Sequence, residues 1–230
     1  TVRPNISKEL KVDIHQALAL DYEKFTQFSK AKKEAEQVLK IEKRNIWALQ
    51  YLLFLSEKEE NWDQAVGLTK QIQKITGKHD PDDLARFQVY KGLEKLKSGF
   101  PDEARSFFNK ALKSSPDFGL PYRYLGDVFE QIRDLVKAVE NWESFAVRDI
   151  KNASLVFGKI ESALFDLGRY SEVENFYRRI LEIDSSNFEA IIRLANVLEE
   201  KGEDGAALSL IEDAIDPQSV DVRGDIMKLK

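Results

Sequence analysis

Several residue types that build chemical sites are scarce in this chain of 230 residues. It has no cysteine, two histidines and one methionine. The lack of cysteine excludes a disulfide framework and a thiolate metal site in this segment, and it fits a reducing compartment. The two histidines, His15 and His79, lie in no sequence context that suggests a catalytic triad. We therefore predict no catalytic residues and expect that the protein is not an enzyme.

Long apolar runs and phosphate-binding loops are also missing. No stretch approaches about 18 uncharged apolar residues, so we expect no segment that inserts directly into a membrane. The start, TVRPNISKEL, has no apolar core, which predicts no signal peptide. Because this start lacks methionine, we expect the sequence to be a fragment of a longer protein. The eleven glycines fall mostly at turns rather than in a phosphate loop, and we predict no cofactor.

One segment, GKHDPDD, combines His79 with Asp80, Asp82 and Asp83. A histidine beside three carboxylates is compatible with a divalent ion. The alternative is that the aspartates cap and begin a helix, because acidic residues are favoured at helix N-termini. We favour the cap and predict no metal site.

A recurrence of about 34 residues organises what remains. Small residues recur at or near multiples of 34 positions, at Ala104, Ala138 and Ala207. A period of this length with a small residue at one fixed point is typical of stacked helical hairpins. Successive copies start 34, 39, 34, 35 and 34 residues apart, at Val12, Ile46, Ala85, Gly119, Ser154 and Phe188.

Each copy is expected to contain two helices, with the small residue near the start of the second one, where it lets the two helices approach closely. Pro101 and Pro121 lie where a helix is expected to begin, a place where the missing N–H of proline costs nothing. The small-residue positions are Ala31, Ala65, Ala104, Ala138, Val173 and Ala207, with valine as the exception. Four residues further on, the chain has Ala35, Thr69, Phe108, Trp142, Tyr177 and Ile211, of which the first two are the smallest.

These hairpins resemble tetratricopeptide repeats over about residues 12–216. The resemblance implies an all-α fold, a right-handed superhelical solenoid of about six hairpins that forms a single domain over residues 1–230. It also implies a protein–protein adaptor, in which the first helices line a concave groove. One subset of the family grips a carboxylate with a Lys and Asn clamp, but this sequence has Gln16 and Leu20 at the equivalent places.

Repeat positions 2, 5, 6, 9, 12 and 13 are expected to face that groove. Tyr51, Tyr90 and Tyr124 share one position in three consecutive copies. Aromatic residues and arginine dominate binding hot spots, so we predict this ladder as the partner-binding surface. The alternative is that the tyrosines pack between neighbouring first helices, and the sequence favours neither reading. The groove candidates are Trp47, Gln50, Tyr51, Phe54, Arg86, Val89, Tyr90, Leu93, Leu96, Arg123, Tyr124 and Phe165, whereas Trp62 and Trp142 are expected in the core.

The net charge of −5 is unevenly distributed along the chain. Residues 1–115 carry 21 Lys and Arg against 17 Asp and Glu, and residues 116–230 carry 14 against 23. This asymmetry is explained either by solubility or by a partner that lies along the charge gradient. The basic excess of four is spread over helix faces, so we expect a protein or peptide partner and no nucleic acid.

The stretch from Ala48 to Leu96 and the late segment IIRLANVLEEKGEDGAALSLIEDAI are similar to bacterial tetratricopeptide proteins of lipopolysaccharide assembly. That resemblance implies a cytoplasmic regulatory scaffold, tethered to the inner membrane by a segment absent here. Its implied role is either to bring a membrane protease to a lipid-A biosynthetic enzyme or to coordinate envelope assembly. The paired Cys-x-x-Cys motifs of the metal module in those proteins are absent from this sequence.

We therefore predict a non-catalytic interaction scaffold. Two alternatives stay open. One is a regulatory repeat domain attached to an enzyme or metal module outside this segment. The other is self-association through the last apolar face, at Ile211, Ala214, Ile215 and Val220.

Overall fold

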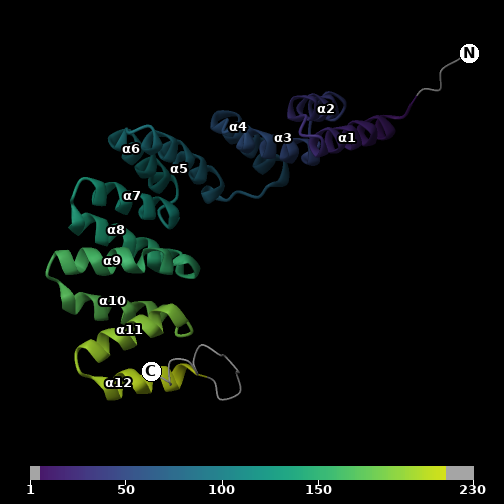
Figure 1. Cartoon of the computed structure of the whole chain (residues 1–230). Helices are drawn as coiled ribbons and strands as arrows, with labels where there is room; N and C mark the ends of the chain where they lie inside the picture. The colour runs from purple at the N-terminus through teal and green to yellow at the C-terminus, as the bar shows by residue number, and fades with distance from the viewer. Residues whose placement is uncertain (1–5, 216–230) are drawn as a thin grey trace, which may run out of the picture. The chain divides into compact units, whose positions relative to one another are not determined.

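The computed structural model describes residues 6–215, which form helices joined by turns and short loops, with no strand among them (Figure 1). The expected all-α fold of about six helical hairpins is confirmed, because the described residues form twelve α-helices and one short 3-10 helix, η1 (Ile150–Asn152). The α-helices are α1 (Lys8–Lys24), α2 (Phe28–Ile41), α3 (Ile46–Lys58), α4 (Trp62–Thr76), α5 (Pro81–Lys97), α6 (Pro101–Ser114), α7 (Leu120–Gln131), α8 (Leu135–Arg148), α9 (Ser154–Asp166), α10 (Tyr170–Ile183), α11 (Phe188–Glu200) and α12 (Asp204–Ala214).

The chain divides into two compact units, unit 1 (Thr1–Ser98) and unit 2 (Gly99–Lys230). Unit 1 contains α1 to α5, and unit 2 contains α6 to α12. Within each unit a helix contacts mainly its neighbours in sequence, as expected for a linear stack, and Figure 1 shows α7 to α12 in successive layers. A single domain over residues 1–230 and a right-handed superhelix stay predictions.

The small-residue positions are the closest contact points of the hairpins. Each is the fourth residue of a second helix, and the exposed fraction of its side chain lies between 0% at Ala31 and 7% at Ala207. Val173, the exception in sequence, is equally buried at 1%. The bulky residues that follow in unit 2, Phe108, Trp142 and Tyr177, are all fully buried. The repeat period therefore locates the contact between the two helices of each hairpin.

Two first helices begin earlier than the repeat starts. α1 begins at Lys8 and α5 at Pro81, one turn before Val12 and Ala85. Ser7 caps α1 by accepting a hydrogen bond from the Leu10 N–H (3.1 Å), and Asp80 caps α5 by accepting one from the Asp82 N–H (2.9 Å). The predicted role of the GKHDPDD segment as a helix cap is confirmed, because Asp80 is the N-cap of α5. The polar caps Ser7 and Asp80 stabilise the additional first turn of α1 and α5.

Every hairpin turn has one residue in the left-handed region of backbone space, five residues before the small residue. Three are the glycines noted in the sequence, Gly99, Gly168 and Gly202, with φ of 81°, 70° and 79°. The other three are Thr26, Glu60 and Arg133, with φ of 58°, 52° and 63°. In the turn at Arg133, the Asp134 N–H donates to the Phe129 carbonyl (2.9 Å) and the Arg133 N–H donates to the Glu130 carbonyl (3.0 Å). This hydrogen-bond pattern ends a helix and requires a positive φ whatever the side chain.

Arg133→Gly is expected to raise the free energy of unfolding of unit 2 by about 0.5–1 kcal/mol. A left-handed conformation costs an L-residue about 1–2 kcal/mol, and part of this gain is offset by the greater chain entropy of glycine. Urea unfolding followed by circular dichroism measures the change. Gln131→Gly, two residues earlier in the last turn of α7, is the control and should destabilise instead. Equal destabilisation by both variants would contradict the proposal that the backbone at Arg133 is strained.

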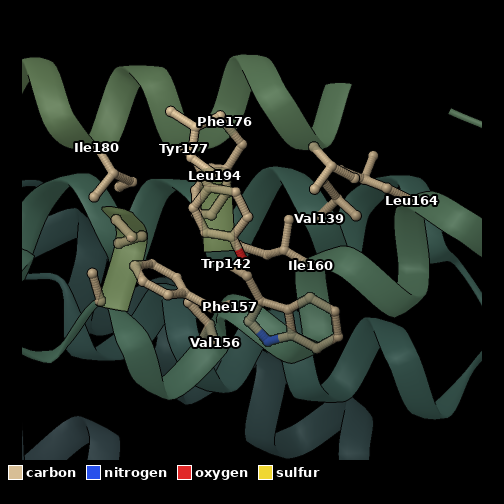
Figure 2. Packing of buried hydrophobic residues seen from close by; sticks show 14 of the residues in the cluster. Val139, Trp142, Val156, Phe157, Ile160, Leu164, Phe176, Tyr177, Ile180 and Leu194 are labelled. Atoms are coloured by element: carbon tan, nitrogen blue, oxygen red, sulfur yellow. The ribbon is translucent and has the colours of Figure 1, made fainter. Parts of the chain in front are cut away.

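A large buried cluster among the described residues lies in unit 2 and contains residues of α8 to α12; Figure 2 shows part of it. Phe157 on α9 has no exposed surface, and its ring meets the rings of Phe176 (5.6 Å) and Tyr177 (5.2 Å) edge-on. Trp142 is also fully buried, and its indole N–H donates to Asp127 Oδ1 (3.0 Å). The wide aromatic side chains of α8 to α10 thus build a core without any contribution from distant parts of the chain.

Candidate functional site

The α3 row is a line of aromatic rings along one face of α3, made of Trp47, Tyr51 and Phe54. Trp47 stacks on Tyr51 with ring centroids 5.1 Å apart and planes within 6°, and Tyr51 lies 6.2 Å from Phe54. Lys58 ends the row, with its Nζ 4.7 Å from the centroid of the Phe54 ring. The spacing of four, three and four residues places all four side chains on one helix face. Three of the predicted groove residues are therefore brought together.

Tyr51 is the buried centre of this row. Its side chain is 8% exposed, and its hydroxyl donates a hydrogen bond to the Ala19 carbonyl of α1 (3.2 Å). Burial, followed by the interaction with Glu23, raises the pKa of Tyr51 well above its ordinary value. Tyr51 thus joins α3 to α1, and the surface of the row is left to Trp47, which is half-buried, and Phe54, which is 38% exposed.

The candidates on α5 are arranged differently. Arg86 forms an ion pair with Glu57 of α3 (2.6 Å), in which both side chains are about one-third exposed. Val89 is fully buried and has no surface to offer a partner. Tyr90 and Leu93 are half-buried and, with Trp62, line a cavity of about 360 Å³ whose other lining residues are Glu60, Glu94, Lys97 and Ser98.

Trp62 differs from the expectation that it belongs to the core. It is the first residue of α4, it is half-buried, and its ring lies 4.9 Å from that of Tyr90. Its indole nitrogen is buried without a hydrogen-bond partner among residues 6–215. The helical period correctly indicates that Trp62 lies on the side of α4 that faces α5. It does not indicate that α5 leaves part of the Trp62 side chain exposed to a cavity.

In unit 2 the predicted groove residues occupy separate environments. The Tyr124 ring stacks on Phe108 of α6, with centroids 5.8 Å apart, and the Arg123 guanidinium lies 5.5 Å from the Tyr124 ring. Phe165, near the end of α9, is 43% exposed and lies 5.4 Å from the ring of Tyr170. Tyr124 is therefore half-buried and packs against the core residue Phe108, whereas Phe165 lies at the surface.

The position that holds tyrosine in three copies holds cations in the last two, Lys159 and Arg193. Lys159 contacts Asp127 (2.9 Å) and Glu130 (3.0 Å) of α7. Burial alone would lower the pKa of Lys159, but its hydrogen bonds to these two carboxylates outweigh burial and raise the pKa. At this repeat position, cations of α9 and α11 therefore join neighbouring first helices of unit 2 by ion pairs, whereas α3 and α5 of unit 1 carry tyrosine there.

Glu161 is a polar link that the repeat pattern did not predict. It accepts hydrogen bonds from the Tyr177 hydroxyl (2.6 Å) and from Arg193 (2.7 Å). Burial, with the hydrogen bond to Glu161, raises the pKa of Tyr177 far above its ordinary value. The Glu161 carboxylate thus provides an acceptor for the fully buried Tyr177 and for the partly buried Arg193.

Two cavities meet around Phe165. One, of about 340 Å³, is lined by residues of α9 and α11: Glu161, Phe165, Glu189, Ile192, Arg193, Asn196, Val197 and Glu200. The other, of about 320 Å³, reaches α10 and is lined by Phe165, Tyr170, Ser171, Val173, Glu174, Val197, Glu200 and Lys201. The two cavities share three lining residues, Phe165, Val197 and Glu200, so they are neighbours on the surface around Phe165.

The two histidines contribute no cluster of metal ligands. His15 Nδ1 lies 2.6 Å from Glu34 Oε2 and links α1 to α2, and His79 is exposed. Over residues 6–215, no group of three or more His, Cys, Asp or Glu side chains is arranged to hold a metal ion. Within the same range, no helix has both the length and the apolar character needed to cross a bilayer.

The period of about 34 residues, the buried small residue in each second helix and the stacking of neighbouring helices define a helical-repeat protein with hairpins of the tetratricopeptide type. No protein-family model matches the sequence. The chain is similar to lipopolysaccharide assembly protein B of Escherichia coli K12, with 22% identity over 192 residues, which are 84% of this chain and 49% of that protein. The chain thus spans about half the length of the curated relatives it matches.

Solved tetratricopeptide structures also resemble this chain. PilF of Pseudomonas aeruginosa matches 97% of this chain and 99% of its own, with 16% identity and a TM-score of 0.43. A signal-transduction ATPase with a tetratricopeptide repeat sensor, from Pyrococcus horikoshii, matches 92% of this chain and 36% of its own, with 18% identity and a TM-score of 0.47.

Proposed function

We propose that this protein is a non-catalytic scaffold that holds a segment of a partner protein against the surface of its first helices. The observation that supports this most directly is the α3 row, where Trp47 and Phe54 flank a buried Tyr51. Rigid aromatic side chains bury a large area at a low cost in side-chain entropy, which is why they dominate binding hot spots. Tyr51 contributes by holding the other two rings in place.

The polar neighbours of the row supply orientation. Gln50 is exposed one position before Tyr51, and Lys58 lies against the outer ring. Arg86 is held by Glu57, so its guanidinium keeps a defined position beside the row. Capture is non-covalent in this proposal. Aromatic anchors provide the affinity, and Arg86 sets the register of the segment bound at unit 1.

The narrower proposal concerns the pathway. The similarity to lipopolysaccharide assembly protein B supports a partner that takes part in assembly of the bacterial envelope. We place the scaffold in the cytoplasm in this proposal, where a segment outside this chain would tether it to the inner membrane. Attachment to an enzyme or metal module outside the chain, and self-association, are the competing proposals. Of the residues expected to self-associate, Val220 lies outside the described range, and Ile211, Ala214 and Ile215 are half-buried.

Replacing both Trp47 and Phe54 by alanine is expected to weaken capture of the native partner by at least about tenfold, because each removes an aromatic anchor from the surface. The measurement is affinity capture from a bacterial lysate with the full chain as bait, followed by quantitative mass spectrometry. An envelope-assembly protein lost with the double variant supports both the site and the pathway.

Val147→Ala on α8 is the matched control, since this apolar side chain is 42% exposed but belongs to a second helix. It should leave capture unchanged. Circular dichroism must show that the double variant keeps the helical content and melting temperature of the parent. If the same partner bound the double variant as tightly as the parent, the α3 row would not be the binding surface.

A further inference from the structure

An apolar hollow, the edge pocket, lies beside the turn between α9 and α10. It is lined by the end of α9, the start of α10 and the end of α11. Its apolar wall consists of Phe165, Tyr170, Val173 and Val197. Phe165 is 43% exposed and Tyr170 is 62% exposed, although their rings lie only 5.4 Å apart. Two neighbouring aromatic rings with this much exposed surface gain free energy from a further apolar side chain that covers them.

The volume of the edge pocket limits what it can hold. At about 320 Å³ it lies at the small end of the range for ligand sites, which is about 300–1,000 Å³. One large side chain of a protein segment suits this volume, and the neighbouring cavity between α9 and α11 offers space for the adjoining residues of the segment.

The charges around the hollow favour a basic segment. The residues that line the edge pocket include two carboxylates, Glu174 and Glu200, and one cation, Lys201, which leaves a net charge of −1. Lys201 is already paired with Glu174 (2.7 Å) and Glu203 (2.8 Å). Glu200 is exposed and forms no ion pair within residues 6–215, so its charge is available to a partner.

The same feature occurs once more in the chain. The cavity beside Trp62 in unit 1 has an aromatic residue at the first position of a second helix, as does the edge pocket with Tyr170. Trp62 precedes Ala65 by three residues, and Tyr170 precedes Val173 by three. An aromatic residue also begins α2, at Phe28, but only Trp62 and Tyr170 line the cavities described here. Both cavities have one carboxylate in excess, but only the edge pocket has two exposed aromatic rings, Phe165 and Tyr170, in its wall.

We propose that the edge pocket binds one aromatic or leucine side chain of a partner segment, next to a Lys or Arg that pairs with Glu200. This proposal rests on the scaffold function, and it names the chemistry of a contact that the α3 row does not make. The apolar anchor covers Phe165 and Tyr170, and the basic neighbour offsets the excess of negative charge. Electrostatic attraction from this rim mainly selects the partner and speeds association.

The test uses the full chain and a fluorescein-labelled Gly-Ser peptide that carries one Trp between two Arg residues. Fluorescence anisotropy is expected to show saturable binding that weakens about tenfold in Tyr170→Ala and several-fold in Glu200→Gln. A peptide with Glu in place of both Arg residues is expected to bind at least about tenfold more weakly. Since Tyr170 and Glu200 are exposed, both variants should keep the circular dichroism spectrum of the parent.

Leu155→Ala is the matched control, because this residue is 51% exposed at the other end of α9 and does not line the hollow. Equal binding by Tyr170→Ala and the parent, or by the acidic and the basic peptide, would overturn the edge pocket. The Trp47 and Phe54 variants should leave binding of this peptide unchanged. The peptide experiment therefore tests the edge-pocket proposal alone. The scaffold proposal is tested separately, by the capture experiment with the Trp47 and Phe54 variants.

Discussion

Gly126→Ala is expected to lower the free energy of unfolding of unit 2 by about 2–3 kcal/mol, the upper part of the range for inserting an extra methyl group into a packed core. A Cβ at this position would lie 2.3 Å from both Cδ1 and Nε1 of Trp142, closer than real Cβ contacts come. The indole cannot move aside freely, since Trp142 has no exposed surface and donates to Asp127. Urea unfolding monitored by circular dichroism measures the loss.

Gly158→Ala is the control for Gly126→Ala. Gly158 lies inside α9 with open space where a Cβ would lie, so alanine should stabilise it by about 0.5–1 kcal/mol through helix propensity alone. The double variant Gly126→Ala with Trp142→Leu should cost less than the sum of its two single changes, because leucine removes the ring that the new methyl group meets. Strict additivity would show that the clash is not the cause.

Phe157→Ala is expected to destabilise unit 2 by about 3–5 kcal/mol, the usual cost of deleting a fully buried aromatic side chain. The ring has no exposed surface and meets the rings of two residues of α10 edge-on (Figure 2). Its removal leaves a cavity that the stiff packing of α8 to α10 cannot fill. Thermal unfolding of the variant and the parent measures the difference.

Phe165→Ala provides the contrast on the same helix, two turns later. Because Phe165 is 43% exposed, we expect a change in unfolding free energy within about 0.5–1 kcal/mol. The same variant should weaken binding of the basic peptide to the edge pocket. Comparable stability losses for Phe157→Ala and Phe165→Ala would show that Phe165 belongs to the core and would remove the wall of that pocket.

Much of the fold could be predicted from spacing alone. A side chain at the crossing of two helices must be small, so Ala65, Ala104 and Ala138 report the contact wherever they recur. Val173 is buried at the equivalent position although valine is larger than alanine, because the surrounding packing accommodates the two additional methyl groups. The turns could be predicted only in part. Glycine indicates a positive φ, but Glu60 and Arg133 adopt it because the helix-ending hydrogen bonds demand it.

The candidate site was less predictable for a geometric reason. A repeat position specifies on which side of a helix a residue lies. Along the length of the helix, however, that side contacts a neighbouring helix in some places and solvent in others. Tyr51 and Val89 therefore share the expected groove positions with Phe54 and Gln50, yet the first two are buried and the last two are exposed. Tyr170 was not predicted from the sequence, because it begins a second helix, and its only signal was an aromatic residue three positions before Val173.

The sequence by itself determined the helical class, the 34-residue unit, the residues at each hairpin contact and the scarcity of catalytic side chains. These follow from local periodicity and composition, which depend on near neighbours along the chain. Only the tertiary structure decided which aromatic residues stay exposed, which cations are paired, and where Phe165 and Tyr170 leave a hollow. Those properties arise from the exact distances between helices, because a shift of a few ångströms converts a surface ring into a buried one.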